Sequence, residues 1–226
     1  MISLINVVYQ DDALLVLNKP AGLLCVPGRG PDKQDCLSTR VLSEFADALV
    51  VHRLDMATSG LVVMARGIAN QRFLSRAFAA RQVQKRYIAL VDGNLAGSPA
   101  EWQTIDLPLM ADWPNRPLQK VDHALGKPSS TRWRVADAAV LAMAANAWGP
   151  VTSNTRHSLH TCLEVEPLTG RTHQIRLHLA SVGHPILGDG LYAGSLVAAA
   201  TPRLMLHAQS LRFSHPVTDF YLNVNC

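Results

Sequence analysis

An aspartate in a nine-residue segment is the first candidate for chemistry in this chain. Asp55 lies in the sequence His-Arg-Leu-Asp-Met-Ala-Thr-Ser-Gly, residues 52–60, and the apolar run Leu61–Ala65 follows at once. Arg53 and the backbone N–H groups of a small-residue turn would hold its carboxylate ionised, as a nucleophile or a base requires. A simpler interpretation is also open, in which Asp55 and Thr58 cap a turn and Arg53 forms a surface ion pair.

A second motif, late in the chain, favours the chemical interpretation. Residues 169–176 have the sequence Thr-Gly-Arg-Thr-His-Gln-Ile-Arg, and residues 183–189 have Gly-His-Pro-Ile-Leu-Gly-Asp. Together with Arg-Leu-Asp at 53–55, they resemble the motifs of the RluA family of RNA pseudouridine synthases. The resemblance runs from Asn18 to Ala193 and departs from the family pattern in the last eight residues, which leaves the pairing of the last strand open.

The resemblance implies both an activity and a set of catalytic residues. Enzymes of this family break the bond from ribose to uracil N1, turn the base and rejoin it through C5. Asp55 would then be the catalytic carboxylate, either attacking the sugar or removing a sugar proton. Tyr87 would lie against the flipped uracil and assist proton transfer, and Arg171 would pair with Asp55 and keep it charged. The reaction needs no redox step or energy source, so we expect no cofactor and no metal.

The same resemblance implies an RNA partner. The target uridine must leave its stack, and Arg53 is the candidate that fills the vacancy. The loop at residues 113–117, Trp-Pro-Asn-Arg-Pro, is similar to that of a family member acting on both 23S rRNA and tRNA. Stem-loops of both RNAs are therefore the expected substrates. The other expected RNA contacts are His52, Thr58, Arg29, Arg116, Lys120, Lys127 and Arg176.

Composition agrees with an RNA partner and narrows the alternatives. The 226 residues carry a net charge of +4, and 16 of the 21 basic residues are arginine, which suits phosphate binding but also follows from a GC-rich genome. The four cysteines are scattered, which indicates reduced thiols. His157, His160 and Cys162 are only a weak metal candidate, because a strand would place two of them on one face by its period alone.

Location and assembly are also expectations at this level. The sequence contains no run of about eighteen apolar residues, the length that a bilayer span needs. The N-terminus also lacks the pattern of a signal peptide. We therefore expect a cytoplasmic protein without a membrane partner or nucleotide cofactor, and a monomer is the simplest assembly.

The sequence also allows three other functions to be compared with the isomerase. A protein of the same fold could bind or fold RNA without catalysis, although Asp55, Tyr87 and Arg171 are all present. A synthase could also act on only one RNA class. A hydrolase is disfavoured because the chain has no Gly-x-Ser-x-Gly segment and no paired-histidine metal motif.

The elements that must position the first motif follow from hydrophobic periodicity. The chain should open with a hairpin from residues 5–9 and 13–18, because turn residues separate the two apolar runs. Helical spacing is present at 37–49 and again at 68–83. In the second helix Arg72, Arg76 and Arg81 lie off the apolar stripe, either as a solvated face or as an RNA contact. Strands are expected directly after Asp55 and at 85–91.

The second half predicts a sheet with one capped helix. Residues 106–128 are rich in proline and should form an exposed, rigid loop. Strands at 131–135 and 160–166 should be joined by a variable connection, and Thr172 should cap a helix that ends at Gly183. Strands near 204–207 and 211–213 would complete the sheet. The resemblance implies an α+β fold, the pseudouridine synthase fold, with a mixed, mainly antiparallel bisected sheet in a single catalytic domain, 1–226, without an S4 domain.

Overall fold

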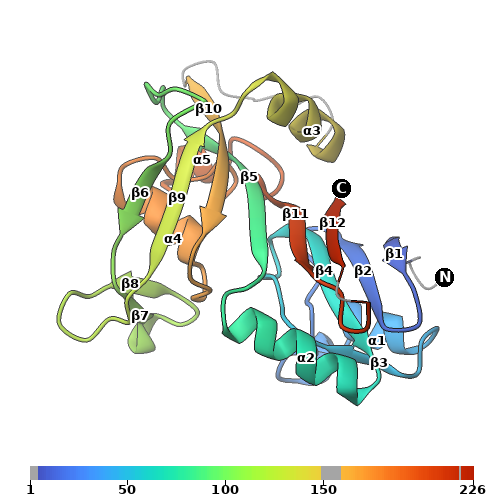
Figure 1. Ribbon diagram of the computed structural model, residues 1–226. Coiled ribbons are helices and arrows are strands. Elements are labelled where there is room, and N and C mark those ends of the chain that lie inside the picture. Colours follow the sequence, from blue (N-terminus) through green and yellow to red (C-terminus); the bar gives the residue numbers. More distant parts are fainter. Residues whose placement is uncertain (1–4, 149–158, 219) are drawn as a thin grey trace. The chain divides into compact units, whose positions relative to one another are not determined.

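The computed structural model describes residues 5–148, 159–218 and 220–226, and its chain divides into two compact units (Figure 1). The first unit holds residues 1–85 and 208–226, and the second holds residues 86–207. The chain passes from one unit to the other within strands β5 (Gln84–Asp92) and β11 (Leu206–Ser214). The single catalytic domain expected for residues 1–226 stays a prediction.

The first unit is built on a central pair of strands that are buried along most of their length. Its strands are β1 (Val7–Gln10), β2 (Leu14–Lys19), β3 (Ala48–Val50), β4 (Ser59–Arg66), β11 and β12 (Tyr221–Asn225). They lie in the order β1-β2-β4-β11, with β3 also on β4 and β12 on β11. The run Leu14–Leu17 is buried throughout, as an uninterrupted apolar segment predicts for an interior strand. The N-terminal hairpin and the strand after Asp55 are thereby confirmed.

Two helices accompany this sheet, and one is shorter than expected. Helix α2 (Ile68–Ala79) packs Leu74 and Ala77 into the core beside β4, as its apolar stripe predicts. Helix α1 (Leu37–Leu42) ends well before residue 49. The segment that follows instead pairs as β3 with β4, because edge pairing satisfies its backbone groups as well as a helix would.

The second unit contains an antiparallel sheet in the order β5-β10-β9-β6. Besides β5, its strands are β10 (His160–Pro167), β9 (Ser130–Val135) and β6 (Gln103–Asp106). The helices are α3 (Ala138–Trp148), α4 (Gln174–Ser181) and the short α5 (Ser195–Ala198). This arrangement confirms the α+β class with a mainly antiparallel sheet.

Two expectations for irregular or broken segments were wrong, those for residues 106–128 and for the last part of the sheet. Residues 106–128 form more than a loop, because β7 (Leu109–Ala111) and β8 (Gln119–Val121) pair as a separate hairpin around the short 3₁₀ helix η2 (Trp113–Asn115). The expected strands β9 and β10 do pair as antiparallel neighbours, and the variable connection between them contains α3, in keeping with the high helix propensity of alanine. The two strands expected near 204–207 and 211–213 are one continuous strand, β11. It pairs with β12, the last strand of the chain, in register from Ser210↔Asn225 to Ser214↔Tyr221.

Among the described residues, no helix is long and apolar enough to cross a membrane.

Candidate active site

Asp55 lies in a turn at the start of β4, as the sequence predicts. Its carbonyl oxygen accepts a hydrogen bond from Thr58 N–H at 3.1 Å, and its side chain is half-buried. Gly60 has φ 108°, and a Cβ there would lie 2.3 Å from the Ala208 carbonyl oxygen, so a larger residue would disrupt the turn. Thr58 is only 3% exposed, which corrects the expectation that its side chain contacts RNA.

Lys19 supports this turn from inside the first unit. The lysine is fully buried, and its ammonium donates hydrogen bonds to the carbonyl oxygens of Pro20 and Leu23 at 2.8 Å and of Met56 at 3.0 Å. A buried cation is tolerated only when such acceptors replace its hydration. Because Met56 follows Asp55 directly, Lys19 joins the end of β2 to the turn that carries the candidate carboxylate.

His52 faces inward, which does not fit its expected RNA contact. Its ring stacks on Phe78 of α2 with centroids 4.2 Å apart, and its Nε2 accepts a hydrogen bond from Val63 N–H at 3.0 Å. Desolvation, with a smaller effect of the nearby Lys85 charge, lowers the pKa of His52 to about 3. The imidazole is therefore neutral at physiological pH and anchors the segment that leads to Asp55. Arg53, by contrast, is exposed.

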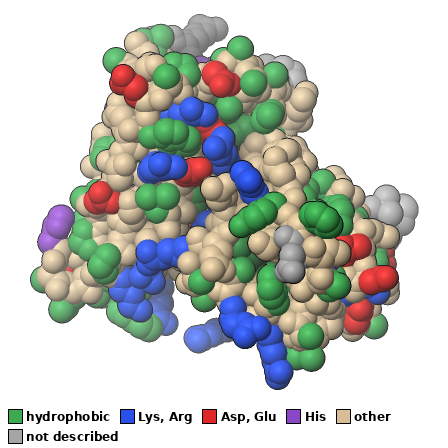
Figure 2. Space-filling view, viewed as in Figure 1, with side chains coloured by type: hydrophobic (Ala, Val, Ile, Leu, Met, Phe, Trp, Pro, Cys, Tyr) green, Lys and Arg blue, Asp and Glu red, His purple; other side chains and the backbone are tan. Residues whose placement is uncertain are grey.

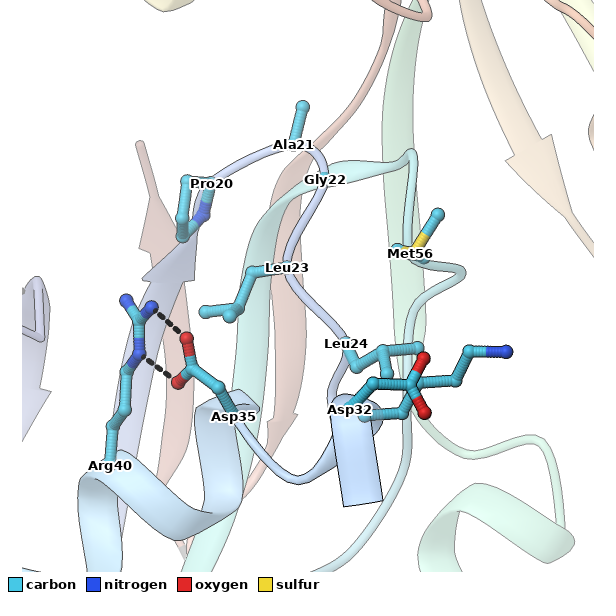
Figure 3. A pocket seen from close by; sticks show the side chains of 10 residues that line it. Pro20, Ala21, Gly22, Leu23, Leu24, Asp32, Asp35, Arg40 and Met56 are labelled. Atoms are coloured by element: carbon cyan, nitrogen blue, oxygen red, sulfur yellow. Dashed lines mark hydrogen bonds and ion pairs between the residues drawn. The ribbon is translucent and has the colours of Figure 1, made fainter. Parts of the chain in front are cut away.

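A cavity of about 440 Å³ lies beside the Asp55 turn within the first unit (Figure 3). Its walls include residues 20–24, Met56, Asp32 and Lys33. Arg40 and Asp35 complete it and form a two-point ion pair at 2.7 Å. Because acidic and basic groups both line the space, it has no strong preference for an anion.

Tyr87 lies on the α4 side of the sheet in the second unit. It pairs across the strands with Val165, which pairs in turn with Trp133, so these three residues share a face. Thr131 is on the same face of β9, and its hydroxyl is 2.9 Å from His178 Nδ1 of α4. Tyr87 and the helix that follows the Thr-Gly-Arg motif therefore belong to one side of this sheet.

The opposite face of the same strands carries a network of charged residues. Glu164 binds Arg86 at 2.8 Å and also Arg134, while Glu166 binds Arg86 and Arg132. The three guanidinium groups lie over the ring of Trp102. Figure 2 shows basic and acidic side chains interleaved over the region of β5, β9 and β10.

Gln174 organises the turn that precedes α4. Its Oε1 accepts hydrogen bonds from Thr169 Oγ1 at 2.6 Å and from Arg171 N–H at 3.0 Å. Its Nε2 donates to Ser130 O and Thr131 Oγ1, both at 2.9 Å. The expectation that Thr172 caps the helix was wrong, because the residue before the helix is His173, with φ 54°. The buried side-chain amide of Gln174 accepts the hydrogen bonds of the turn instead.

The two arginines of this motif have opposite environments. Arg171 is exposed. Arg176 is buried and binds Asp189 through Nε and Nη2 at 2.8 and 2.6 Å. This burial corrects the expectation that Arg176 contacts the RNA backbone. The structure places Asp55 in the first unit and Tyr87 and Arg171 in the second, so the meeting of these three stays a prediction.

The motifs that these elements position match a known enzyme family. The family model described as RNA pseudouridylate synthase matches residues 13–181, a span that includes Asp55, Tyr87 and Arg171. The chain belongs to the RNA pseudouridylate synthase family. A relative from Yersinia pestis named dual-specificity RNA pseudouridine synthase RluA is 44% identical over 97% of both chains. The protein of the same name from Escherichia coli K12 is 45% identical over 93% of this chain and 87% of its own.

Solved structures agree with this assignment. The human RNA pseudouridylate synthase domain containing 1 matches with a TM-score of 0.76 and 25% identity, covering all of this chain and 84% of its own. The human domain containing 4 protein shares the fold, with a TM-score of 0.68 and 24% identity. The protein is thus an RNA pseudouridine synthase, which is an isomerase.

Four other basic residues expected to contact RNA are exposed in this synthase. Arg29 lies in the loop after Cys25, and Arg116 and Lys120 lie on the β7–β8 hairpin, with Lys127 shortly after it. The Arg116 guanidinium stacks 3.4 Å from the centroid of Trp113, and Lys120 lies 3.5 Å from Asp122. Figure 2 shows Lys and Arg side chains gathered over this part of the second unit. Their contacts to RNA stay predictions.

No group of three histidine, cysteine or acidic residues in the described chain could hold a metal ion. His160 and Cys162 lie in β10, and His157, the other member of the weak metal candidate, lies outside the described residues.

Sequence reasoning about the synthase missed the supporting role of two buried polar residues. Lys19 was visible as a lysine ending an apolar strand, in the segment Asn-Lys-Pro-Ala-Gly, and Gln174 was visible inside the second motif. What no pattern in the sequence showed was which carbonyl and hydroxyl groups would surround them.

Proposed function

We propose that this synthase isomerises loop uridines of both 23S rRNA and tRNA, with Asp55 as the catalytic carboxylate. The near full-length likeness to proteins named dual-specificity RNA pseudouridine synthase RluA carries the proposal of two RNA classes. The held turn at the start of β4 supports the role of Asp55, because a catalytic carboxylate needs a fixed position relative to the ribose.

The reaction exchanges one glycosidic bond for another. The bond from C1′ to N1 breaks, the uracil turns, a bond from C1′ to C5 forms, and the proton on C5 is replaced by one on N1. Asp55 acts either by attacking C1′ or by removing a ribose proton. Tyr87 offers a ring for stacking against the uracil and a hydroxyl that can donate or accept the proton. Arg53, exposed two residues before Asp55, fills the space of the flipped base.

The arginine that accompanies Asp55 comes from the Thr-Gly-Arg motif, and two residues compete for this role. Arg171 is the residue that the sequence resemblance favours. Arg176 is favoured by its surroundings, because a guanidinium that is buried and held at two nitrogens is fixed in place, whereas an exposed one is not. Arg171→Met decides between them through its single-turnover rate, because Arg171 is exposed and its replacement should leave the fold intact, whereas replacing Arg176 would also break its ion pair with Asp189.

Three further statements complete the proposal. The synthase acts in the cytoplasm, where its RNA substrates are found, and it acts as a monomer formed by a single catalytic domain, 1–226. It uses neither a metal nor a nucleotide, because the isomerisation changes no oxidation state and consumes no phosphate bond.

Mapping of pseudouridine tests the proposal directly. Total rRNA and tRNA from cells with and without the protein are derivatised with a carbodiimide and mapped by mass spectrometry. We expect sites in both RNA pools to disappear without the protein, and to return with wild type and with Asp12→Asn but not with Asp55→Asn. Asp12 is a matched control because its carboxylate is fully exposed, 3.9 Å from its ion-pair partner Arg66.

The outcomes separate the alternatives. Loss of sites in one pool alone would reduce the proposal to a single RNA class. Unchanged maps together with retained RNA binding would favour a protein of the same fold that binds RNA without catalysis. Restoration by Asp55→Asn would remove Asp55 from the mechanism.

A further inference from the structure

Three segments of the second unit meet at the hydroxyl of Tyr192. The hydroxyl oxygen accepts a hydrogen bond from Gln119 N–H, the first residue of β8, at 2.9 Å. The same hydroxyl shares a hydrogen bond of 2.7 Å with Nδ1 of His173, the residue before α4. One side chain thus joins the β7–β8 hairpin to the start of the helix that contains Arg176.

His173 holds an uncommon backbone conformation at this point. Its φ of 54° is left-handed, and among the described residues only one other that is not glycine, Arg81, has a positive φ. Such a conformation persists where the surroundings hold it. The His173 and Tyr192 rings meet edge to face, with centroids 5.6 Å apart and planes at 75°, which is a favourable aromatic geometry.

Tyr192 is itself fixed from the other side. Its backbone N–H donates to Asp189 Oδ1 at 3.2 Å, and the Arg176 guanidinium lies 5.3 Å from the centre of its ring. Arg176 and Asp189 form the buried two-point ion pair described above. Tyr192 is therefore a rigid anchor, because Asp189 and Arg176, which contact it, hold each other in a buried ion pair.

The β7–β8 hairpin, which Tyr192 holds through Gln119, carries exposed cations. Arg116 and Lys120 lie on either side of Gln119, and both are exposed. Within the hairpin, Gln119 pairs with Ala111, and its N–H group points instead to Tyr192. A two-stranded hairpin alone is only marginally stable in water, so an anchor outside the hairpin limits its motion.

We propose that Tyr192 and His173 form a latch, a pair of side chains that holds the β7–β8 hairpin against the start of α4. The cations of the hairpin and the Thr-Gly-Arg motif at residues 169–176 then bind RNA as one rigid surface. This role rests on the proposed RNA substrate. Tyr192 is a positioning residue, and its hydroxyl acts through the Gln119 backbone and the His173 ring without touching the uracil.

Tyr192→Phe tests the latch, because it removes the shared hydroxyl and keeps the ring. We expect the KM for a tRNA stem-loop to rise about fivefold, the size of one lost hydrogen bond, with kcat unchanged. Hydrogen exchange should be faster at the Gln119 amide and across residues 109–121. Tyr221→Phe is the matched control, since Tyr221 is 65% exposed on β12, and it should change neither.

A second variant shows whether the two residues act together. His173→Asn keeps a residue type that tolerates a left-handed backbone. If the latch is one unit, Tyr192→Phe combined with His173→Asn raises KM no further than the worse single variant does. His173→Asn also serves if Tyr192→Phe lowers the melting temperature too far for kinetics.

Two results would overturn the latch. One is unchanged exchange at Gln119 in Tyr192→Phe, and the other is a fall in kcat with KM unaltered. Failure of the proposed substrates is distinguishable, because wild-type protein would then leave both RNA classes unmodified while the exchange experiment still reports on the hairpin.

Discussion

Arg176 and Asp189 form a two-point ion pair, at 2.8 and 2.6 Å, in which the side chains are 5% and 0% exposed. Burial alone would raise the pKa of Asp189, but the Arg176 guanidinium and the backbone N–H groups of Leu191 and Tyr192 bring it below its usual value. The pair connects the family's late motif, at the start of α4, to the Gly-Asp turn that precedes Tyr192.

Removing one partner of this pair should destabilise the fold. Arg176→Met leaves Asp189 as an uncompensated buried charge, and we expect the free energy of unfolding to fall by about 3–5 kcal/mol. Urea denaturation measures this change. The exposed Arg171→Met should change it by less than about 0.5 kcal/mol. Equal losses in both variants would contradict the different environments of the two arginines.

Lys19→Met should weaken both stability and turnover. The substitution leaves the carbonyl oxygens of Pro20, Leu23 and Met56 without their ammonium donor, at a cost of about 3 kcal/mol in unfolding free energy. Turnover should fall as well, because the Asp55 turn loses its anchor. Lys33→Met, at an exposed position of the same unit, is the control for thermal melting and for single-turnover rate. A stable Lys19→Met variant would disprove this role.

Asp55→Asn should abolish turnover while leaving RNA binding intact. The amide keeps the size of the side chain but can neither attack C1′ nor take a proton, and we expect the single-turnover rate to fall by at least about 10²- to 10⁴-fold. Filter binding of the stem-loop measures affinity in parallel. A similar loss in affinity would indicate damage to the turn and not to the chemistry.

Acid should destabilise the first unit through His52. Its pKa is about 3 in the folded protein against 6.5 for an ordinary histidine, so the unfolded chain binds a proton that the folded chain excludes. The contribution of neutral His52 to the free energy of unfolding is therefore fully present above pH 6.5. It is lost as pH drops toward 3, by up to about 1.4 kcal/mol per pH unit. His52→Gln should flatten this profile in urea titrations, whereas the exposed His123→Gln should not.

The cations near the hairpin should bind RNA electrostatically. If Lys127 contacts a phosphate, Lys127→Gln lowers affinity and reduces the slope of log K against log salt by about 0.7 for a single-stranded loop. Arg212→Gln, on β11 of the first unit, is the control. An unchanged slope for Lys127→Gln would remove this residue from the RNA surface.

Local patterns predicted the elements that carry the motifs. The N-terminal hairpin, the strand after Asp55, α2, β5, β9 and β10 all follow from periodicities of two or 3.6 residues, which depend only on neighbouring residues. The errors lie where pairing with a distant segment decided the outcome. β3 took residues from an expected helix by pairing with β4, and the β7–β8 hairpin formed inside a proline-rich segment.

By itself, the sequence determined the family and the class of reaction, because Arg53-Leu54-Asp55 and the Thr-Gly-Arg motif are contiguous residue types that need no fold to be recognised. Tertiary structure decided which of these polar residues face inward. His52, Thr58 and Arg176 have the same local signature as residues that meet RNA, yet Phe78, the start of β4 and Asp189 enclose them. The physical reason is that burial of a polar group depends on partners distant in sequence, which satisfy its hydrogen bonds and charge only after the chain has folded.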